Sequence, residues 1–163
     1  MMKWLGILLM VPMLAFATEV GKLAPDFSLP GLKQDSVKLA DYKGKVVYVD
    51  FWASWCGPCR KSFPWLNEMQ QKYGKQGFTV IGINVDQKRE DADKFLAQVP
   101  AQFTIAFDAQ GNTPKAYQIK GMPSSLIIDQ NGNVQSMHAG YTEEKAAELE
   151  ATIRKALEKN PKS

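Results

Sequence analysis

The fold is decided between residues 46 and 60, where the sequence is VVYVDFWASWCGPCR. Its first half, 46–52, is a nearly continuous apolar run rich in β-branched and aromatic residues, which is typical of a strand buried on both faces. A helix is expected from about Cys56 to Tyr73, because large apolar residues recur there at helical spacing. A second buried strand is predicted over 78–85. Strand, helix and strand at this spacing predict a βαβ unit with parallel strands.

The remaining segments predict a complete α/β domain around this unit. A lead-in with a short hairpin precedes it, and an amphipathic helix, a short strand, a hairpin with an Asn-Gly turn and a closing helix follow it. In chain order these elements are 27–29, 37–39, 89–98, 104–107, 124–128, 134–139 and 143–157. The predicted architecture is a central mixed sheet with helices on both faces.

The two cysteines of the chain, Cys56 and Cys59, lie three residues apart at the predicted start of the first helix. Such a short loop constrains the unfolded chain little, so a structural clip is the weaker interpretation. In a first helical turn their Cα atoms would be roughly 5–5.5 Å apart, within disulfide range. The helix N-terminus would stabilise a thiolate at Cys56 as the attacking group, and Cys59 would resolve the mixed disulfide. With the lone His138 about 80 residues on, we expect neither a metal site nor a cofactor.

Asp50 is the one charged residue in the apolar run 46–53. A buried carboxylate is costly unless it is protonated or partnered, although strand twist could instead expose it. Because Asp50 precedes Cys56 by six residues on the strand that delivers the motif, we favour a functional interpretation. A carboxyl with a raised pKa beneath the dithiol can take and return the proton of Cys59.

Pro123 stands in Gly121-Met122-Pro123-Ser124, directly before a predicted strand. Proline is tolerated at the first residue of a strand, which needs no functional explanation. The functional alternative is a cis Met122–Pro123 bond beside the dithiol. Sequence physics does not choose between the two, because cis is a small minority of X–Pro bonds.

The N-terminus predicts export. Lys3 precedes an apolar run from Trp4 to Ala17 that ends in an A-x-A site, as in a secretory signal peptide. We therefore expect a signal peptide over 1–17 and one domain over 18–163, in the periplasm or otherwise outside the cytoplasm. An uncleaved anchor is the alternative, although a spanning helix needs about 20 residues. The net charge of +3 is spread along the chain, so no nucleic-acid partner is expected.

Residues 49–60 closely resemble the active-site stretch of thioredoxin, and 117–123 are similar to the thioredoxin segment that ends in its cis-proline. The longer connection between them, with room for an extra helix and strand, and the lead-in 24–29 look like the exported TlpA/ResA branch of the thioredoxin superfamily. The resemblance implies a thioredoxin fold.

Carried over residue by residue, the resemblance makes Cys56 the nucleophile, Cys59 the resolving thiol and Asp50 the buried proton-transfer acid. Pro123 matches the cis-proline, with Met122 presenting its backbone to the substrate. Trp55 matches the tryptophan that flanks the dithiol.

The predicted activity is thiol:disulfide exchange that reduces protein disulfides outside the cytoplasm through a mixed disulfide. The Gly57-Pro58 spacer matches thioredoxin, whose potential is about −270 mV against about −120 mV for the oxidant DsbA. An oxidising compartment cannot keep the pair reduced, so a membrane-bound donor of the DsbD type is implied. We expect a monomer.

Other functions remain as alternatives. An oxidase or isomerase is the nearest. A thiol peroxidase is a less favoured function, because Val49 and Ala53 stand where that activity needs Pro and Thr or Ser. A copper chaperone is also less favoured, because His138 lies in a predicted strand. Members that serve cytochrome c maturation often carry Glu just after the second strand, where this chain has Gln87. The sequence does not identify the client protein.

Overall fold

The computed structural model describes residues 18–33 and 35–159, so the predicted signal peptide, 1–17, lies outside the described residues. The described chain forms a five-stranded sheet and a two-stranded hairpin, with helices packed around them. The strands are β1 (Ser28–Pro30), β2 (Ser36–Lys38), β3 (Val46–Trp52), β4 (Phe78–Asn84), β5 (Thr104–Phe107), β6 (Ser124–Ile128) and β7 (Val134–Ala139). The α-helices are α1 (Gly57–Tyr73), α2 (Arg89–Gln98), α3 (Asn112–Ala116) and α4 (Glu143–Glu158), and 3-10 turns span Leu39–Tyr42 and Gly74–Gln76.

The large sheet is mixed, with strand order β5-β4-β3-β6-β7. The central strand β3 is parallel to β4 and antiparallel to β6. This is the predicted βαβ unit, in which α1 connects two parallel neighbours. In the register Asp50 lies opposite Gly82 on one side and Ser125 on the other. Every residue of β3 is buried, as its apolar run predicts.

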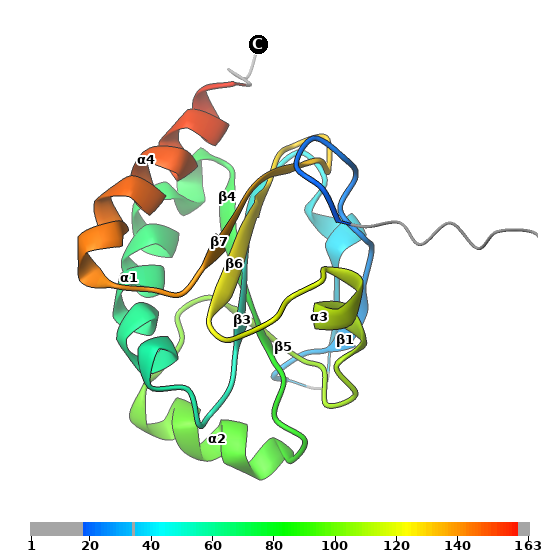
Figure 1. Ribbon diagram of the computed structural model, residues 1–163, viewed down its shortest axis with the longest axis vertical. Coiled ribbons are helices and arrows are strands. Elements are labelled where there is room, and N and C mark those ends of the chain that lie inside the picture. The colour runs from blue at the N-terminus through cyan, green and yellow to red at the C-terminus, as the bar shows by residue number, and fades with distance from the viewer. Residues whose placement is uncertain (1–17, 34, 160–163) are drawn as a thin grey trace, which may run out of the picture.

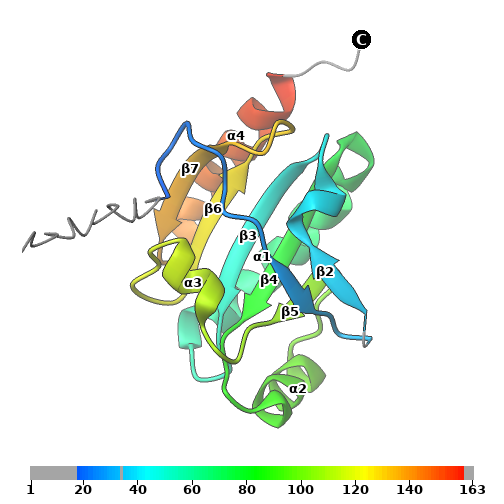
Figure 2. The same ribbon diagram turned by 90° about the vertical axis from the view of Figure 1, so that its right-hand side faces the viewer.

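Two layers cover the sheet, as predicted. Helices α1 and α4 pack on one face, and α3 with the β1–β2 hairpin covers the other (Figure 1). Figure 2 shows the second face toward the viewer, with α3 and the hairpin in front of the strands. Residues of β3 alternate between two apolar clusters. Tyr48 and Trp52 belong to the cluster under α1 and α4, whereas Val49 and Phe51 belong to the cluster under the hairpin.

The helix α3 is the one α-helix of the described residues that the sequence did not predict. It has five residues and includes Pro114, so it is too short to show an apolar period. Its start is fixed by Asp108, whose carboxylate accepts hydrogen bonds from the N–H groups of Gly111 and Thr113. Gly111 has φ +69°, a left-handed conformation that suits glycine. The helix therefore depends on a contact from the preceding loop rather than on its own pattern.

In the part of the chain that the structure describes, no helix combines the length and the apolar character needed to cross a membrane. The uncleaved anchor that the sequence left as an alternative falls on residues outside that part.

Candidate redox site

The two cysteines form a disulfide at the start of α1. Their Cα atoms are 5.3 Å apart, as expected for the first turn of a helix. Cys56 is the N-cap residue, and its Sγ accepts a hydrogen bond from the Cys59 N–H at 3.2 Å. Pro58 occupies the first helical turn, where its missing N–H leaves no hydrogen bond unmade. When the bond is reduced, this N–H and the helix dipole favour a thiolate at Cys56.

The two sulfur-bearing side chains differ in access. Cys59 is completely buried, whereas Cys56 keeps 4% of its surface exposed and is flanked by exposed Trp55 and Gly57. An incoming disulfide can therefore reach Cys56 first. Cys59 has no exposed surface, so a proton on its thiol has no direct contact with solvent.

Asp50 is buried, 3% exposed, so strand twist does not bring it to the surface. Burial raises the pKa of its carboxyl well above the ordinary range. Its register neighbours, Gly82 and Ser125, carry no charge, and its Oδ2 has no hydrogen-bond partner. Nothing in this surrounding compensates a negative charge, so the protonated form is favoured.

Asp50 also faces the helix that carries the dithiol. Side chains two residues apart on a strand share a face, so Asp50 points to the same side as Tyr48 and Trp52. Both of these pack in the cluster that contains Cys59. The structure thus brings the predicted acid and the predicted resolving thiol to one face of β3.

The Met122–Pro123 bond is cis. Because Phe51 pairs with Ser124, this bond lies at the end of the sheet where β3 leads into the turn 53–56 that delivers Cys56, here called the dithiol loop. Met122 is half-buried and packs against the cluster that contains both cysteines. A groove of about 380 Å³ runs past this bond to Gly140. At the same end, Trp55 has 71% of its surface exposed.

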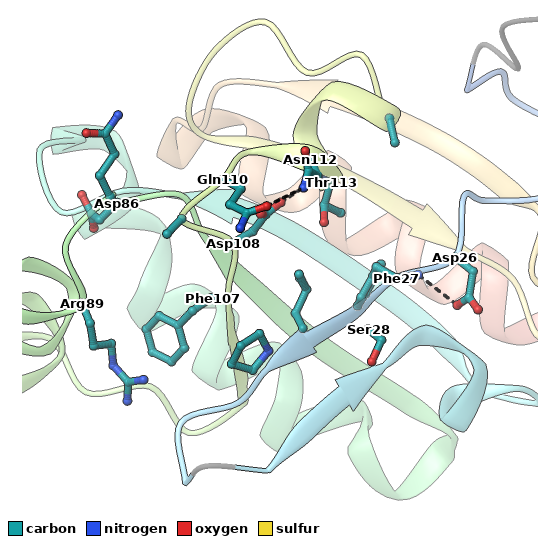
Figure 3. Close-up of a pocket in the computed structure, with 15 residues that line it drawn as sticks. Asp26, Phe27, Ser28, Asp86, Arg89, Phe107, Asp108, Gln110, Asn112 and Thr113 are labelled. Carbon is teal, nitrogen blue, oxygen red and sulfur yellow. Dashed lines mark hydrogen bonds between the residues drawn. The ribbon is translucent and has the colours of Figure 1, made fainter.

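A cleft of about 710 Å³ lies elsewhere and does not include either cysteine. It opens between β1, the β4–α2 loop and the segment around α3 (Figure 3). Its two buried carboxylates, Asp86 and Asp108, are already occupied by hydrogen bonds from protein groups. We therefore assign the chemistry to the disulfide and its surroundings rather than to this cleft.

Other aromatic and polar residues near the site have structural surroundings. Trp52 and Trp65 are packed in the core. His138 lies on β7, as predicted, and partial burial lowers its pKa. Gln87 is exposed at the rim of the large cleft.

Sequence reasoning missed one contact at this site, between Ser54 of the dithiol loop and Asp86 after β4. The two residues are 32 positions apart, so no local pattern connects them. The one available sign was that polar Asn84 ends a mostly apolar strand and polar Asp86 follows two residues later.

Comparison with known proteins agrees with this geometry. A family model described as Redoxin matches residues 19–153. The thiol-disulfide oxidoreductase ResA of Geobacillus kaustophilus is 37% identical over 124 residues, covering 76% of this chain and 71% of that protein. ResA of Bacillus thuringiensis is 35% identical over 131 residues, covering 80% of this chain and 76% of that protein.

Solved structures are similar over most of the described chain. A crystal structure from Chlorobium tepidum, described as a thiol:disulfide interchange protein DsbE, is 55% identical with a TM-score of 0.84, covering 86% of this chain and 99% of that one. The thioredoxin domain of a thiol-disulfide oxidoreductase from Bacteroides vulgatus is 28% identical with a TM-score of 0.74, covering 83% of this chain and 98% of that one.

Proposed function

The chain belongs to the Redoxin family and is a ResA-like thiol:disulfide oxidoreductase with the thioredoxin fold, and on that premise we propose that it reduces protein disulfides outside the cytoplasm. The observation that carries the proposal is the pairing of two features on one face of β3. One is the disulfide at the N-terminus of α1, and the other is the buried, unpaired carboxyl of Asp50.

In the proposed cycle the reduced enzyme begins as a Cys56 thiolate. It attacks one sulfur of a client disulfide, so a Cys56–client bond forms, the client disulfide breaks and the second client sulfur leaves as a thiolate. Asp50, which burial keeps protonated at rest, gives its proton to that leaving client thiolate, and its carboxylate then accepts the proton of the Cys59 thiol. The Cys59 thiolate then attacks Cys56 Sγ, which forms the Cys56–Cys59 disulfide and releases the first client sulfur. Two electrons pass to the client, and Asp50 returns its proton to a leaving thiolate.

Trp55, Met122 and Pro123 are the proposed substrate-binding residues. Trp55 offers an exposed apolar surface next to Cys56, and Met122 lines the groove at the cis bond and packs against the cluster that contains both cysteines. An extended client segment placed there would present backbone groups to the loop before β6 and its disulfide to Cys56.

The reducing direction of the exchange and the location of the enzyme outside the cytoplasm rest on the sequence. The Gly57-Pro58 spacer matches that of a reducing dithiol, and residues 1–17 have the pattern of a signal peptide. An exported reductase needs electrons from the membrane, so a DsbD-type donor is part of the proposal, as is a monomeric enzyme. Oxidation or isomerisation of disulfides by the same pair is the alternative, and a cytochrome c precursor is one client among those left open.

A redox titration of the purified full chain against glutathione decides the direction. We expect a potential near that of thioredoxin, about −270 mV, together with reduction of insulin disulfides. A potential near that of DsbA, about −120 mV, would replace the proposed reductase by an oxidase. Trapping with Cys59→Ser in the native compartment would then identify the client, because the mixed disulfide on Cys56 can no longer be resolved.

A further inference from the structure

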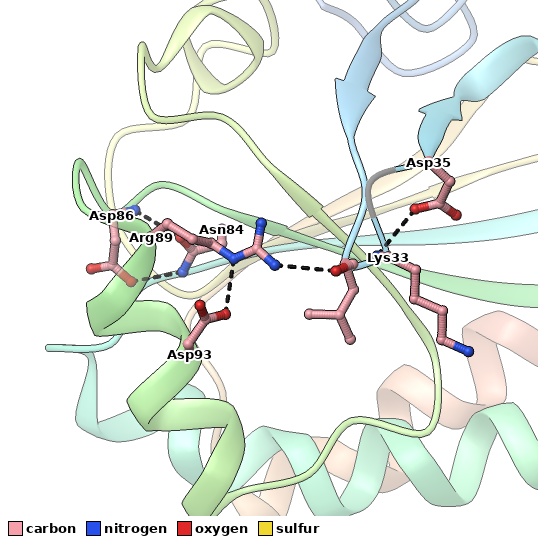
Figure 4. A network of polar contacts seen from close by, with 7 residues as sticks. Lys33, Asp35, Asn84, Asp86, Arg89 and Asp93 are labelled. Carbon is pink, nitrogen blue, oxygen red and sulfur yellow. Dashed lines mark hydrogen bonds and ion pairs between the residues drawn. The ribbon is translucent and has the colours of Figure 1, made fainter.

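Asp86 is a buried acid that the proposed cycle does not use. It lies two residues beyond the end of β4, and 7% of its surface is exposed. Within residues 18–33 and 35–159 no Lys or Arg forms an ion pair with it. The nearby Arg89 is instead bound to Asp93 at 2.8 Å and to the carbonyl of Leu32 at 3.2 Å (Figure 4).

Neutral donors surround the carboxylate instead. The Ser54 N–H donates to Asp86 Oδ2 at 2.9 Å, and the Ser54 hydroxyl donates to Oδ1 at 2.8 Å. The side-chain amide of Asn84 donates to Oδ2 at 2.7 Å, and Figure 4 shows this bond with the return bond from the Asp86 N–H to Asn84 Oδ1. Both carboxylate oxygens are therefore occupied, and both bind the same residue of another loop.

That residue belongs to the turn that delivers the nucleophile. The chain reverses between Ala53 and Cys56, where the Cys56 N–H donates to the Ala53 carbonyl at 3.1 Å. Cys56 then caps α1. The Val85 N–H donates to the Trp52 carbonyl at 3.0 Å, so the loop after β4 holds both the end of β3 and, through Asp86, the dithiol loop. A carboxylate that binds both the main-chain N–H and the hydroxyl of Ser54 fixes the orientation of that residue.

We propose that Asp86 is a positioning residue of the redox site: its carboxylate clamps Ser54 and thereby holds the 53–56 turn that presents Cys56 to a client disulfide. A carboxylate suits this place because all three contacts come from donors, and only an acceptor with two oxygens can take them together. An Asn side chain would turn one of these oxygens into a donor. The proposal deepens the proposed function, on which it rests for the role of Cys56.

The Ser54→Ala variant tests the clamp, because it removes one of the two Ser54 bonds and leaves the charge of Asp86 in place. With the turn loosened, Cys56 spends less time at the helix N-terminus, so the pKa of its thiol should rise toward the free value of about 8.5. We expect kcat/KM for insulin reduction to fall roughly tenfold, within the ~10²-fold that a misplacement of about 1 Å can cost. Ser54→Thr, which keeps the hydroxyl, should restore both quantities.

Asp108→Asn is the matched control. Asp108 is also a buried carboxylate after a strand, but it caps α3 rather than the dithiol loop. We expect Asp108→Asn to lower the melting temperature without moving the Cys56 titration or kcat/KM. If Ser54→Ala behaves like this control, the clamp is only structural and the proposal is wrong.

The Cys56 titration also separates this proposal from the proposed function. It is measured as the pH dependence of Cys56 alkylation by iodoacetamide in the reduced full chain, which does not depend on the direction of exchange. A wild-type chain that fails to reduce insulin would contradict the reductase, whereas an unshifted alkylation profile in Ser54→Ala would contradict the clamp alone.

Discussion

The two faces of β3 share one backbone and differ in what they bury. On the face under the hairpin and α3, Val49 and Phe51 pack in a cluster whose Tyr117 hydroxyl donates to the Pro25 carbonyl. On the face under α1 and α4, Asp50 and Trp52 alternate with them, and this face carries both of the orphaned polar atoms found in the described chain, Asp50 Oδ2 and Trp52 Nε1.

The two faces of β3 therefore contribute differently to stability and to catalysis. An unsatisfied buried polar group costs about 1–3 kcal/mol. The unpaired atoms under α1 therefore lower the free energy of unfolding below that of a protein with an apolar surface of the same shape there. That same face holds Cys59. We infer that the hairpin face stabilises the fold and that the α1 face gives up stability to keep an ionisable group on the side of β3 that the dithiol helix covers.

The largest expected effect is on the α1 face. Cys56→Ser should abolish disulfide reduction, because a hydroxyl is not ionised at neutral pH and cannot form the mixed disulfide. The measurement is the rate of insulin reduction. Cys59→Ser is the control that keeps the nucleophile: it should also stop turnover but accumulate mixed disulfides with clients. Reductase activity in Cys56→Ser would contradict the assignment.

On the hairpin face, Phe51→Ala should remove about 3–5 kcal/mol from the free energy of unfolding, as usual for a buried Phe. Phe51 is completely buried and contacts the Tyr117 ring at 5.8 Å between centroids. Urea unfolding measures the loss. The pH profile of insulin reduction by the folded fraction should stay as in the wild type, and a shifted profile would mean that the two faces are not separable.

Asp50→Asn should stabilise the protein, increasingly as the pH rises. Because burial raises the pKa of Asp50, the folded state holds a proton that the unfolded state has lost, so stability falls with pH from about 3.9 up to the native pKa. The variant loses this dependence. Above the native pKa the gain is about 1.4 kcal/mol for each unit by which the pKa is raised. Melting temperatures measured across pH give the result, and parallel curves for the two proteins would show that Asp50 is not protonated by burial.

The smallest effect is expected from Tyr117→Phe on the hairpin face. It removes the hydrogen bond to the Pro25 carbonyl and leaves the ring packing intact. The free energy of unfolding should therefore fall by about 0.5–1.5 kcal/mol. The midpoint of urea unfolding measures it. A change in the rate of disulfide exchange would be unexpected and would link the N-terminal segment to the redox site.

The sequence predicted the elements whose patterns are long and local. The apolar run of β3 and the period of α1 were sufficient, and the Asn131-Gly132 turn placed the β6–β7 hairpin correctly. It did not predict α3, which is only five residues long and is capped from outside by Asp108.

At the site, the three-residue spacing of Cys56 and Cys59 predicts the disulfide. The presence of one charged residue in an apolar strand indicates the burial of Asp50. The cis bond before Pro123 could not be assigned, because the free-energy difference between isomers is small and tertiary contacts decide it. The Ser54–Asp86 contact joins two loops distant in sequence, so only the folded chain reveals it.

The pH–rate profile of Asp50→Asn tests most directly whether the α1 face works as one unit. The step to follow is resolution of a mixed disulfide on Cys56 by Cys59, after rapid mixing with a client disulfide. We predict slower resolution near neutral pH and a higher apparent pKa, with the two proteins converging at alkaline pH, where Cys59 ionises without help. A profile identical to that of the wild type would contradict the account.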